Sequence, residues 1–180
     1  GHGPRLISSA GPHIVSPVYP PGFPGILAAV FLIAPDFPAN VYLLKLLSVA
    51  AVAGAGVLTY LLALRRVEAQ STALFIALAT VLSPSLVFLV TSTLMSEGVF
   101  LFVLLSAVLL IERAVIAPPR KDTALALASG VFLGAALLLR TASISLVAAA
   151  FVYLAWKRRW RALAWCMVTT CVVALPWAIY

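Results

Sequence analysis

Long apolar runs separated by short polar turns dominate the chain from residue 41 to its end. Six of them predict membrane-spanning helices, with these bounds: Val41–Leu64, Thr72–Val90, Leu94–Ile111, Thr123–Leu139, Ala142–Trp156 and Ala162–Tyr180. A helix needs about 20 mainly apolar residues to cross a bilayer, whereas a barrel strand alternates apolar and polar residues. Because the runs are continuous, they predict an all-α fold, a polytopic transmembrane helical bundle of about six spans.

Two features modify this prediction inside the bundle. Pro84 lies within the second run, where a proline is expected to kink the helix. The fourth and fifth runs, on either side of Arg140, are short for full spans. A single re-entrant pair is therefore an alternative interpretation of these two runs.

The first 40 residues differ from the rest of the chain. They begin with a loop rich in Gly and Pro, which is followed by the apolar stretch Pro24–Ala34. As a helix this stretch reaches only about 16 Å, about half of the hydrocarbon thickness. We therefore expect an extracytoplasmic loop with an interfacial helix over residues 1–40 and the bundle over residues 41–180. Asn40 is placed to cap the first span.

Composition and charge define the class of protein further. The chain is 64% hydrophobic and 9% charged, far from the roughly 25% charged residues of soluble domains. Its net charge of +7 comes from short basic clusters between apolar runs, which is typical of membrane topology signals and not of a nucleic-acid-binding face. Alternating spans place most basic residues on one side, predicted to be cytoplasmic: Arg65, Arg66, Arg113, Arg120, Lys121, Lys157, Arg158, Arg159 and Arg161. The amino-terminal loop is then extracytoplasmic.

Polar residues at the extracytoplasmic side are the candidates for chemistry. Glu97 opens the third span at the hydrocarbon boundary, where ionisable residues usually face a cavity or partner; the alternative is a carboxylate favoured by the helix dipole. Arg140 has the donor geometry for a phosphate, or it snorkels to lipid headgroups. Lys45 has the same two options, one turn into the first span. The prolines Pro20 and Pro21 predict a rigid turn before the interfacial segment.

The order of the motifs resembles the GT-C membrane glycosyltransferases, in particular the bacterial relatives of protein O-mannosyltransferases and of the lipid A aminoarabinose transferase. The motifs that carry the resemblance are YPPGFP at Tyr19–Pro24, VYLLKLLSV at Val41–Val49, LSPSLVFLVTSTLMSE at Leu82–Glu97, LLLRTA at Leu137–Ala142 and LPWAIY at Leu175–Tyr180. Each motif alone has low specificity. Their order and spacing along nearly the whole chain support the resemblance.

The resemblance implies transfer of a sugar from a polyprenyl-phosphate carrier to an acceptor at the extracytoplasmic face of a bacterial inner membrane. It implies that Glu97 occupies the family's second acidic position, near a metal or donor-phosphate site, so that a divalent cation is a possible cofactor. Tyr19, Pro20 and Pro21 are expected to line a loop above the donor, and Arg140 to contact its phosphate. The family's first span and the acidic loop that supplies its general base should precede Gly1, so we expect an amino-terminally incomplete fragment that is inactive alone.

Two other classes of function remain open. A transporter or flippase segment predicts ionisable residues at mid-bilayer or pairs of broken helices; apart from Lys45 and Arg140, the runs hold no ionisable residue near their centres. A non-catalytic membrane scaffold subunit is the third possibility. The sequence specifies neither the sugar nor the acceptor.

Overall fold

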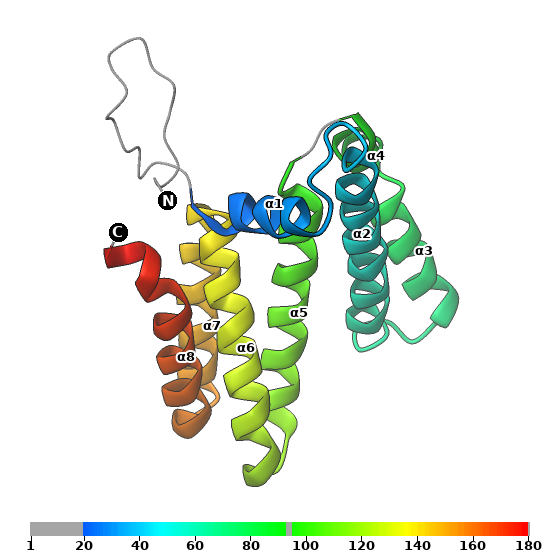
Figure 1. The fold of residues 1–180 in the computed structure, drawn as a ribbon. Coiled ribbons are helices and arrows are strands. Elements are labelled where there is room, and N and C mark those ends of the chain that lie inside the picture. The colour runs from blue at the N-terminus through cyan, green and yellow to red at the C-terminus, as the bar shows by residue number, and fades with distance from the viewer. Residues whose placement is uncertain (1–19, 93–94, 180) are drawn as a thin grey trace.

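The computed structural model describes residues 20–92 and 95–179, and within these ranges the chain is helical without strands. The elements in order are α1 (Gly22–Ile33), α2 (Val41–Ala63), α3 (Gln70–Val81), α4 (Pro84–Ser92), α5 (Glu97–Ile116), α6 (Pro119–Leu139), the 3-10 turn η1 (Thr141–Ser143), α7 (Ile144–Trp156) and α8 (Trp160–Ile179). The predicted all-α class is confirmed. Figure 1 shows α2, α5, α6, α7 and α8 running side by side, with α3 beside α2.

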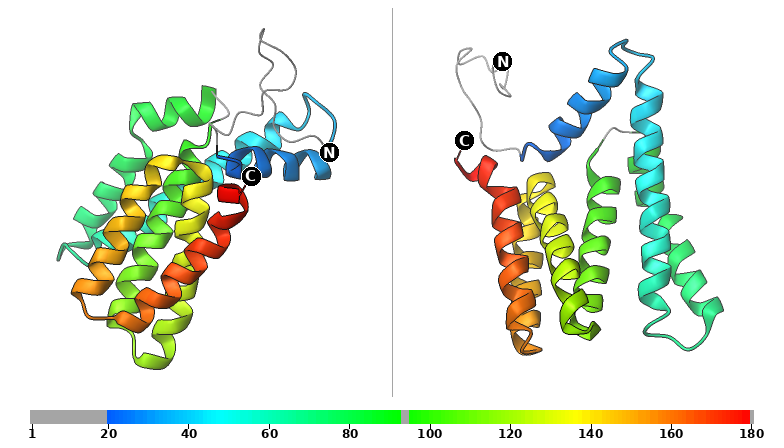
Figure 2. Two further views of the ribbon diagram at one scale, coloured as in Figure 1. Left: turned by 90° about the vertical axis from the view of Figure 1, so that its left-hand side faces the viewer. Right: turned by 60° about the horizontal axis from the view of Figure 1, so that its bottom comes forward.

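The short helix α1 lies across one end of the bundle, and it stays at this end in every view (Figures 1 and 2). Its 12 residues extend about 18 Å, so the predicted apolar segment is confirmed as shorter than a span. Phe23 and Ile26 pack against the buried cluster formed by Val99, Val103, Ala136 and Leu139. We call this end of the bundle the α1 end.

Asn40 does not cap α2 with its side chain, contrary to the prediction. Its own backbone is already helical (φ −69°, ψ −13°), so its carboxamide cannot reach back to the first N–H groups as an extended cap residue would. Its Nδ2 group instead donates to the Ala34 carbonyl at 3.1 Å. The side chain, 1% exposed, thus ties the loop after α1 to the start of α2.

The six predicted spans are only partly confirmed. By length and composition, three helices of the described chain can cross a membrane: α2, α5 and α6 over Lys121–Leu139. The helices α3 and α4 form a fourth span if counted together, and they are bent by 46° where Leu82 and Ser83 interrupt them. This break confirms the kink predicted at Pro84. The apolar parts of α7 and α8 are shorter than a full span.

Helix boundaries also differ from the predicted ones at several turns. The third run was expected to end at Ile111, yet α5 continues to Ile116 because Glu112 and Arg113 remain helical. The fourth run was expected to be short, yet α6 begins at Pro119, a residue favoured in the first turn of a helix. With this added turn α6 is long enough to span, which argues against the re-entrant alternative. The predicted limits Leu94 and Tyr180 lie outside the described residues.

Small residues bring α6 and α8 into close contact. A Cβ atom added to Gly130 would lie 1.9 Å from Thr169 Oγ1, and one added to Gly134 would lie 2.6 Å from Val173 Cβ. The Thr170 hydroxyl donates to the Gly130 carbonyl across this contact at 3.2 Å. The GxxxG sequence formed by Gly130 and Gly134 therefore serves packing between helices of the same chain.

The basic residues gather at the end of the bundle opposite α1, which we call the basic end. The α2–α3, α5–α6 and α7–α8 connections all lie there (Figure 1), and the nine basic residues assigned to one side flank these connections. Arg65 and Arg66 both pair with Glu112, Arg65 at 3.5 Å. The two ends of the bundle therefore differ sharply in charge.

Candidate functional site

Glu97 begins α5 at the α1 end. The residue before it, Ser96, makes no side-chain capping bond. The positive end of the α5 dipole therefore interacts with the Glu97 carboxylate. The side chain of Glu97 is 23% exposed. This position fits the interpretation of Glu97 as a helix-end carboxylate, but the carboxylate also has a charged partner.

That partner is Arg140, which ends α6. Arg140 is extended (φ −151°, ψ 128°), and its N–H bonds the Ala136 carbonyl at 2.8 Å. Its Nη2 group forms an ion pair with Glu97 Oε1, between residues 43 positions apart. The guanidinium carbon also lies 5.7 Å from the centre of the Phe100 ring. The structure thus brings together the two ionisable residues that the sequence singled out.

Ser143 holds the break that directs Arg140 out of α6. The Ser143 hydroxyl lies 2.8 Å from the carbonyl oxygens of both Ala136 and Arg140, and the residue is 2% exposed. Carbonyls at the end of a helix need such an external donor. Sequence reasoning missed this residue. The available signal was a serine three positions after Arg140, the spacing at which a hydroxyl reaches a backbone carbonyl.

The Pro-Pro-Gly turn lies beside the same break. Gly22 packs so closely on α6 that a Cβ atom there would lie 2.5 Å from the Leu138 carbonyl oxygen. Leu138 is two residues before Arg140, and Pro20 and Pro21 directly precede Gly22. The turn predicted from the prolines is therefore at the α1 end, next to the last turn of α6.

Two other predicted site residues are not part of the ion pair. Tyr19 lies outside the described residues, and its role stays a prediction. Lys45 is half-buried on α2, about one turn before Ser48, whose carbonyl would lie 3.3 Å from a Cβ on Gly98. This contact brings Lys45 to the level at which α5 starts. Within the described chain, however, Lys45 forms no salt bridge with Glu97 or any other carboxylate.

The Glu97–Arg140 pair keeps unused bonding capacity. Glu97 Oε2 is buried, and no group of the described residues bonds it. Arg140 has five N–H donors, of which Glu97 accepts one, and its side chain is 43% exposed. A buried oxygen without a donor is costly. The pair can therefore still bind an anion through Arg140 and a hydrogen-bond donor or cation through Glu97.

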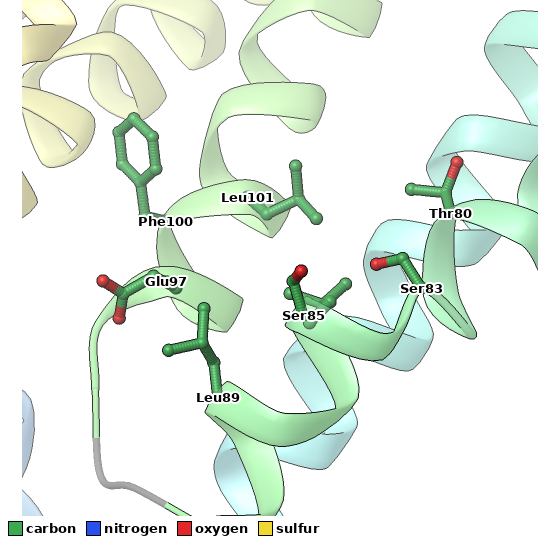
Figure 3. Close-up of a pocket in the computed structure, with 8 residues that line it drawn as sticks. Thr80, Ser83, Ser85, Leu89, Glu97, Phe100 and Leu101 are labelled. Atoms are coloured by element: carbon green, nitrogen blue, oxygen red, sulfur yellow. The ribbon is translucent and has the colours of Figure 1, made fainter.

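A cavity of about 330 Å³ opens next to Glu97, at the break between α3 and α4. Figure 3 shows α4 facing the first turns of α5 across this space, with the serines near the break. The wall consists of aliphatic and aromatic side chains with three hydroxyls, from Thr80, Ser83, Ser85, Leu86, Leu89, Glu97, Phe100 and Leu101. The Thr80 hydroxyl is already bonded to the Ile76 carbonyl at 2.8 Å. The cavity is thus mainly apolar, with a carboxylate at its edge.

The described residues do not by themselves form a metal site. They contain no group of three His, Cys, Asp or Glu side chains that could hold an ion. Divalent cations bind several oxygen ligands, whereas Glu97 is one carboxylate next to a guanidinium that repels a cation. The role of Glu97 as a metal ligand therefore stays a prediction.

Comparison with known proteins gives one match. The family model described as dolichyl-phosphate-mannose-protein mannosyltransferase matches residues 18–180. No curated protein and no solved structure matches the chain. The matched region includes α1, the break at Arg140 and the start of α5, and so covers the whole of the site described above.

Proposed function

Because the chain belongs to the dolichyl-phosphate-mannose-protein mannosyltransferase family of GT-C membrane glycosyltransferases, we propose that it transfers a sugar from a polyprenyl-phosphate carrier to an acceptor at the extracytoplasmic face of a bacterial inner membrane. This membership confirms the resemblance indicated by the ordered motifs. The observation that carries the proposal is the ion pair of Glu97 and Arg140 at the α1 end. The proposal covers the sugar donor, the acceptor and the roles of Glu97 and Arg140.

Arg140 is proposed to bind the phosphate of the donor. In the reaction the acceptor hydroxyl oxygen forms the bond to the sugar's anomeric carbon and gives its proton to a general base, while the bond to the phosphate breaks and the phosphate leaves with the bonding electrons. Negative charge on its oxygens therefore grows in the transition state, where a fixed cation is most effective. The guanidinium is half-exposed, and among the described residues only Glu97 accepts a hydrogen bond from it. Its planar shape matches a phosphate.

Glu97 is proposed to position Arg140 and to bind the donor with its second oxygen. Oε1 holds the guanidinium, while Oε2 lacks a hydrogen-bond donor among the described residues. A sugar hydroxyl or an ion that accompanies the phosphate would satisfy this oxygen. The binding of such a group would remove the cost of an unpaired buried oxygen, so the empty pair favours a bound donor.

The mainly apolar cavity supports a lipid carrier. Leu86, Leu89 and Leu101 line it within a short distance along the chain from Glu97. The transfer of hydrocarbon from water to such an apolar surface lowers the free energy. The first isoprenyl units next to the phosphate are proposed to lie here, and the rest of the chain in the bilayer. A nucleotide-linked sugar would leave this surface unused.

Charge supports the orientation of the site. The nine basic residues at the basic end mark it as cytoplasmic under the positive-inside rule, and the Glu97–Arg140 pair lies at the other end. The pair would then face the extracytoplasmic leaflet.

The experiment measures sugar transfer in membrane vesicles that contain the complete protein. The same labelled hexose is supplied either on polyprenyl phosphate or on a nucleoside diphosphate, over a panel of hexoses. We expect label to enter the acceptor fraction only from the lipid carrier. Equal transfer from the nucleotide, or no transfer from any lipid-linked hexose, would contradict the proposal.

A charge variant then tests the residue. Arg140→Gln is expected to lower kcat/KM by roughly 100-fold, the loss typical of one donor to a developing anion, while Arg140→Lys keeps part of the rate. Arg113→Gln is the matched control, because Arg113 is also exposed but lies at the basic end. A rate that falls equally in Arg113→Gln would remove Arg140 from the site.

The broken pair α3 and α4 favours a second candidate, a lipid-carrier flippase, since broken helices are typical of transporters. The break is lined by the hydroxyls of Ser83 and Ser85, however, and has no ionisable residue of its own. Movement of a fluorescent polyprenyl phosphate across vesicles without any sugar transfer would favour this candidate.

A further inference from the structure

The turn between α7 and α8 concentrates positive charge at the basic end. Its four cations lie within five residues: Lys157, Arg158, Arg159 and Arg161. The flanking Trp156 and Trp160 are 77% and 64% exposed. Exposed tryptophans at this level are typical of the membrane–water interface. We name the segment Trp156–Arg161 the cationic turn.

No carboxylate neutralises the cationic turn within the described chain. Its four cations form no salt bridge. Asp122, at the same end of α6, is buried and accepts a hydrogen bond from the Thr123 hydroxyl at 3.2 Å. The ammonium of Lys157 instead lies 5.5 Å from the centre of the Trp156 ring and 5.7 Å from that of Tyr153.

The α2–α3 connection, at the same end of the bundle, has the opposite arrangement. Arg65 and Arg66 both pair with Glu112, which is 14% exposed. Both connections are basic and both lie at the same end of the bundle (Figure 1). Unlike Arg65 and Arg66, the four cations of the cationic turn pair with no carboxylate of the described chain, so their charges are available to a partner outside it.

The backbone of the cationic turn places an arginine where glycine is usual. The N–H of Arg159 bonds the Leu154 carbonyl at 3.0 Å, and that of Arg158 bonds the Ala155 carbonyl at 2.9 Å. These two bonds form a Schellman motif, whose left-handed position generally holds glycine. Here that residue is Arg158, with φ +54°. A topology signal does not need a cation at this strained position, because any nearby site in the turn would serve.

The same motif gives the cationic turn a positive backbone as well. The last carbonyls of α7 are occupied by the N–H groups of Lys157, Arg158 and Arg159. The first N–H groups of α8, which begins at Trp160, have no carbonyl in their own helix. The unpaired backbone groups at the turn are therefore N–H groups at the positive end of the 20-residue helix α8. Such a helix end favours the binding of anions.

We propose that the cationic turn binds the headgroup of an anionic phospholipid in the leaflet next to it. The phosphate meets unpaired guanidinium groups and the α8 amides, and the tryptophans lie at the depth of the headgroups. Charge complementarity selects an anionic lipid over a zwitterionic one. This binding is independent of the sugar donor, since the turn lies at the end of the bundle opposite the Glu97–Arg140 pair.

The experiment measures quenching of tryptophan fluorescence by brominated lipid in symmetric vesicles that contain the complete protein. Symmetric vesicles make the result independent of the orientation of the protein. Brominated phosphatidylglycerol and brominated phosphatidylcholine are compared in a phosphatidylcholine background, and the ratio of their quenching constants gives the preference. We expect a clear preference for phosphatidylglycerol that weakens with salt, because salt screens exposed charge.

Arg158→Gly tests the turn without harming the fold, since glycine is favoured at φ +54°. Its unfolding midpoint should equal or exceed that of the wild type, while the lipid preference falls about fivefold, the contribution of one surface cation. Adding Arg161→Gln should extend the loss to about 25-fold. The double control Arg65→Gln with Arg66→Gln removes two cations that share the Glu112 carboxylate and should change the preference less than about twofold.

Three results would overturn the proposal. The first is equal quenching by the two lipids in the wild type. The second is an unchanged preference in folded Arg158→Gly. The third is an equal loss in the Arg65/Arg66 control, which would make the effect a general property of the basic end and not of the cationic turn.

Discussion

Gly130→Ala is expected to destabilise the bundle by separating α6 from α8. The new Cβ would lie 1.9 Å from Thr169 Oγ1 and 2.6 Å from the Cys166 carbonyl oxygen. Rotation of Thr169 relieves the first contact, but the second involves backbone, so the helices themselves have to move apart. This movement also weakens the Thr170 bond to the Gly130 carbonyl.

The magnitude follows from three contributions. Overpacking of a close contact costs about 1–3 kcal/mol, and an interhelical hydrogen bond in a membrane protein contributes about 0.6 kcal/mol. Alanine regains about 1 kcal/mol over glycine in helix propensity. We therefore expect the free energy of unfolding of Gly130→Ala to fall by about 0.6–2.6 kcal/mol, measured by titration of the detergent-solubilised protein with a denaturing detergent.

Two further variants make this reasoning refutable. Gly25→Ala is the control, because no atom lies within 4 Å of a Cβ at Gly25, so it should not destabilise the protein. Thr169→Ala combined with Gly130→Ala should recover only part of the loss, since the Cys166 carbonyl stays in place. Wild-type stability in Gly130→Ala, or full recovery in the double variant, would show that α6 and α8 are not held at this distance.

Three further substitutions test the two ends of the bundle. Glu97→Gln should abolish sugar transfer and leave the unfolding midpoint near that of the wild type; full activity would reduce Glu97 to a helix-end carboxylate. Ser143→Ala should lower kcat about tenfold and stability by about 1–2 kcal/mol, because the buried carbonyls of Ala136 and Arg140 lose their hydrogen-bond donor. Ser143→Thr should restore part of both. An unchanged kcat in Ser143→Ala would show that the helix break after α6 does not contribute to sugar transfer. Glu112→Gln should cost at most about 1 kcal/mol, a loss that disappears in high salt as expected for a partly exposed ion pair; a larger, salt-independent loss would mean that Glu112 has a packing role.

The sequence predicted those parts of the fold that depend on local chemistry. Continuous apolar runs predicted the helices, and Pro84 predicted the break between α3 and α4, because a proline removes a backbone donor wherever it stands. The number of spans was less predictable. Hydropathy does not register the extra turn that Pro119 adds to α6, nor the loss of a turn at Thr141–Ser143 that shortens α7.

The site was predicted as separate residues and not as an arrangement. Glu97 and Arg140 were each singled out by an ionisable group at a hydrocarbon boundary, which is a property of one position. Their ion pair joins residues 43 positions apart and depends on how α5 and α6 pack, which no local pattern contains. Asn40 illustrates the same limit: its residue type predicted a cap, yet tertiary contact with Ala34 took its side chain instead.

Arg140 lies at the end of the bundle where a cation is least expected. Nine of the twelve basic residues are at the basic end, and the positive-inside bias disfavours a cation opposite them. A purely structural role would be best served by a carboxylate that uses both oxygens, since bidentate pairing is the strongest geometry for arginine. Glu97 instead engages the guanidinium through Oε1, and its buried Oε2 receives no hydrogen bond from the residues that the structure describes. The pair is thus incomplete on both sides, which is the state expected of groups that complete their bonding only when an anionic, hydroxyl-bearing donor binds.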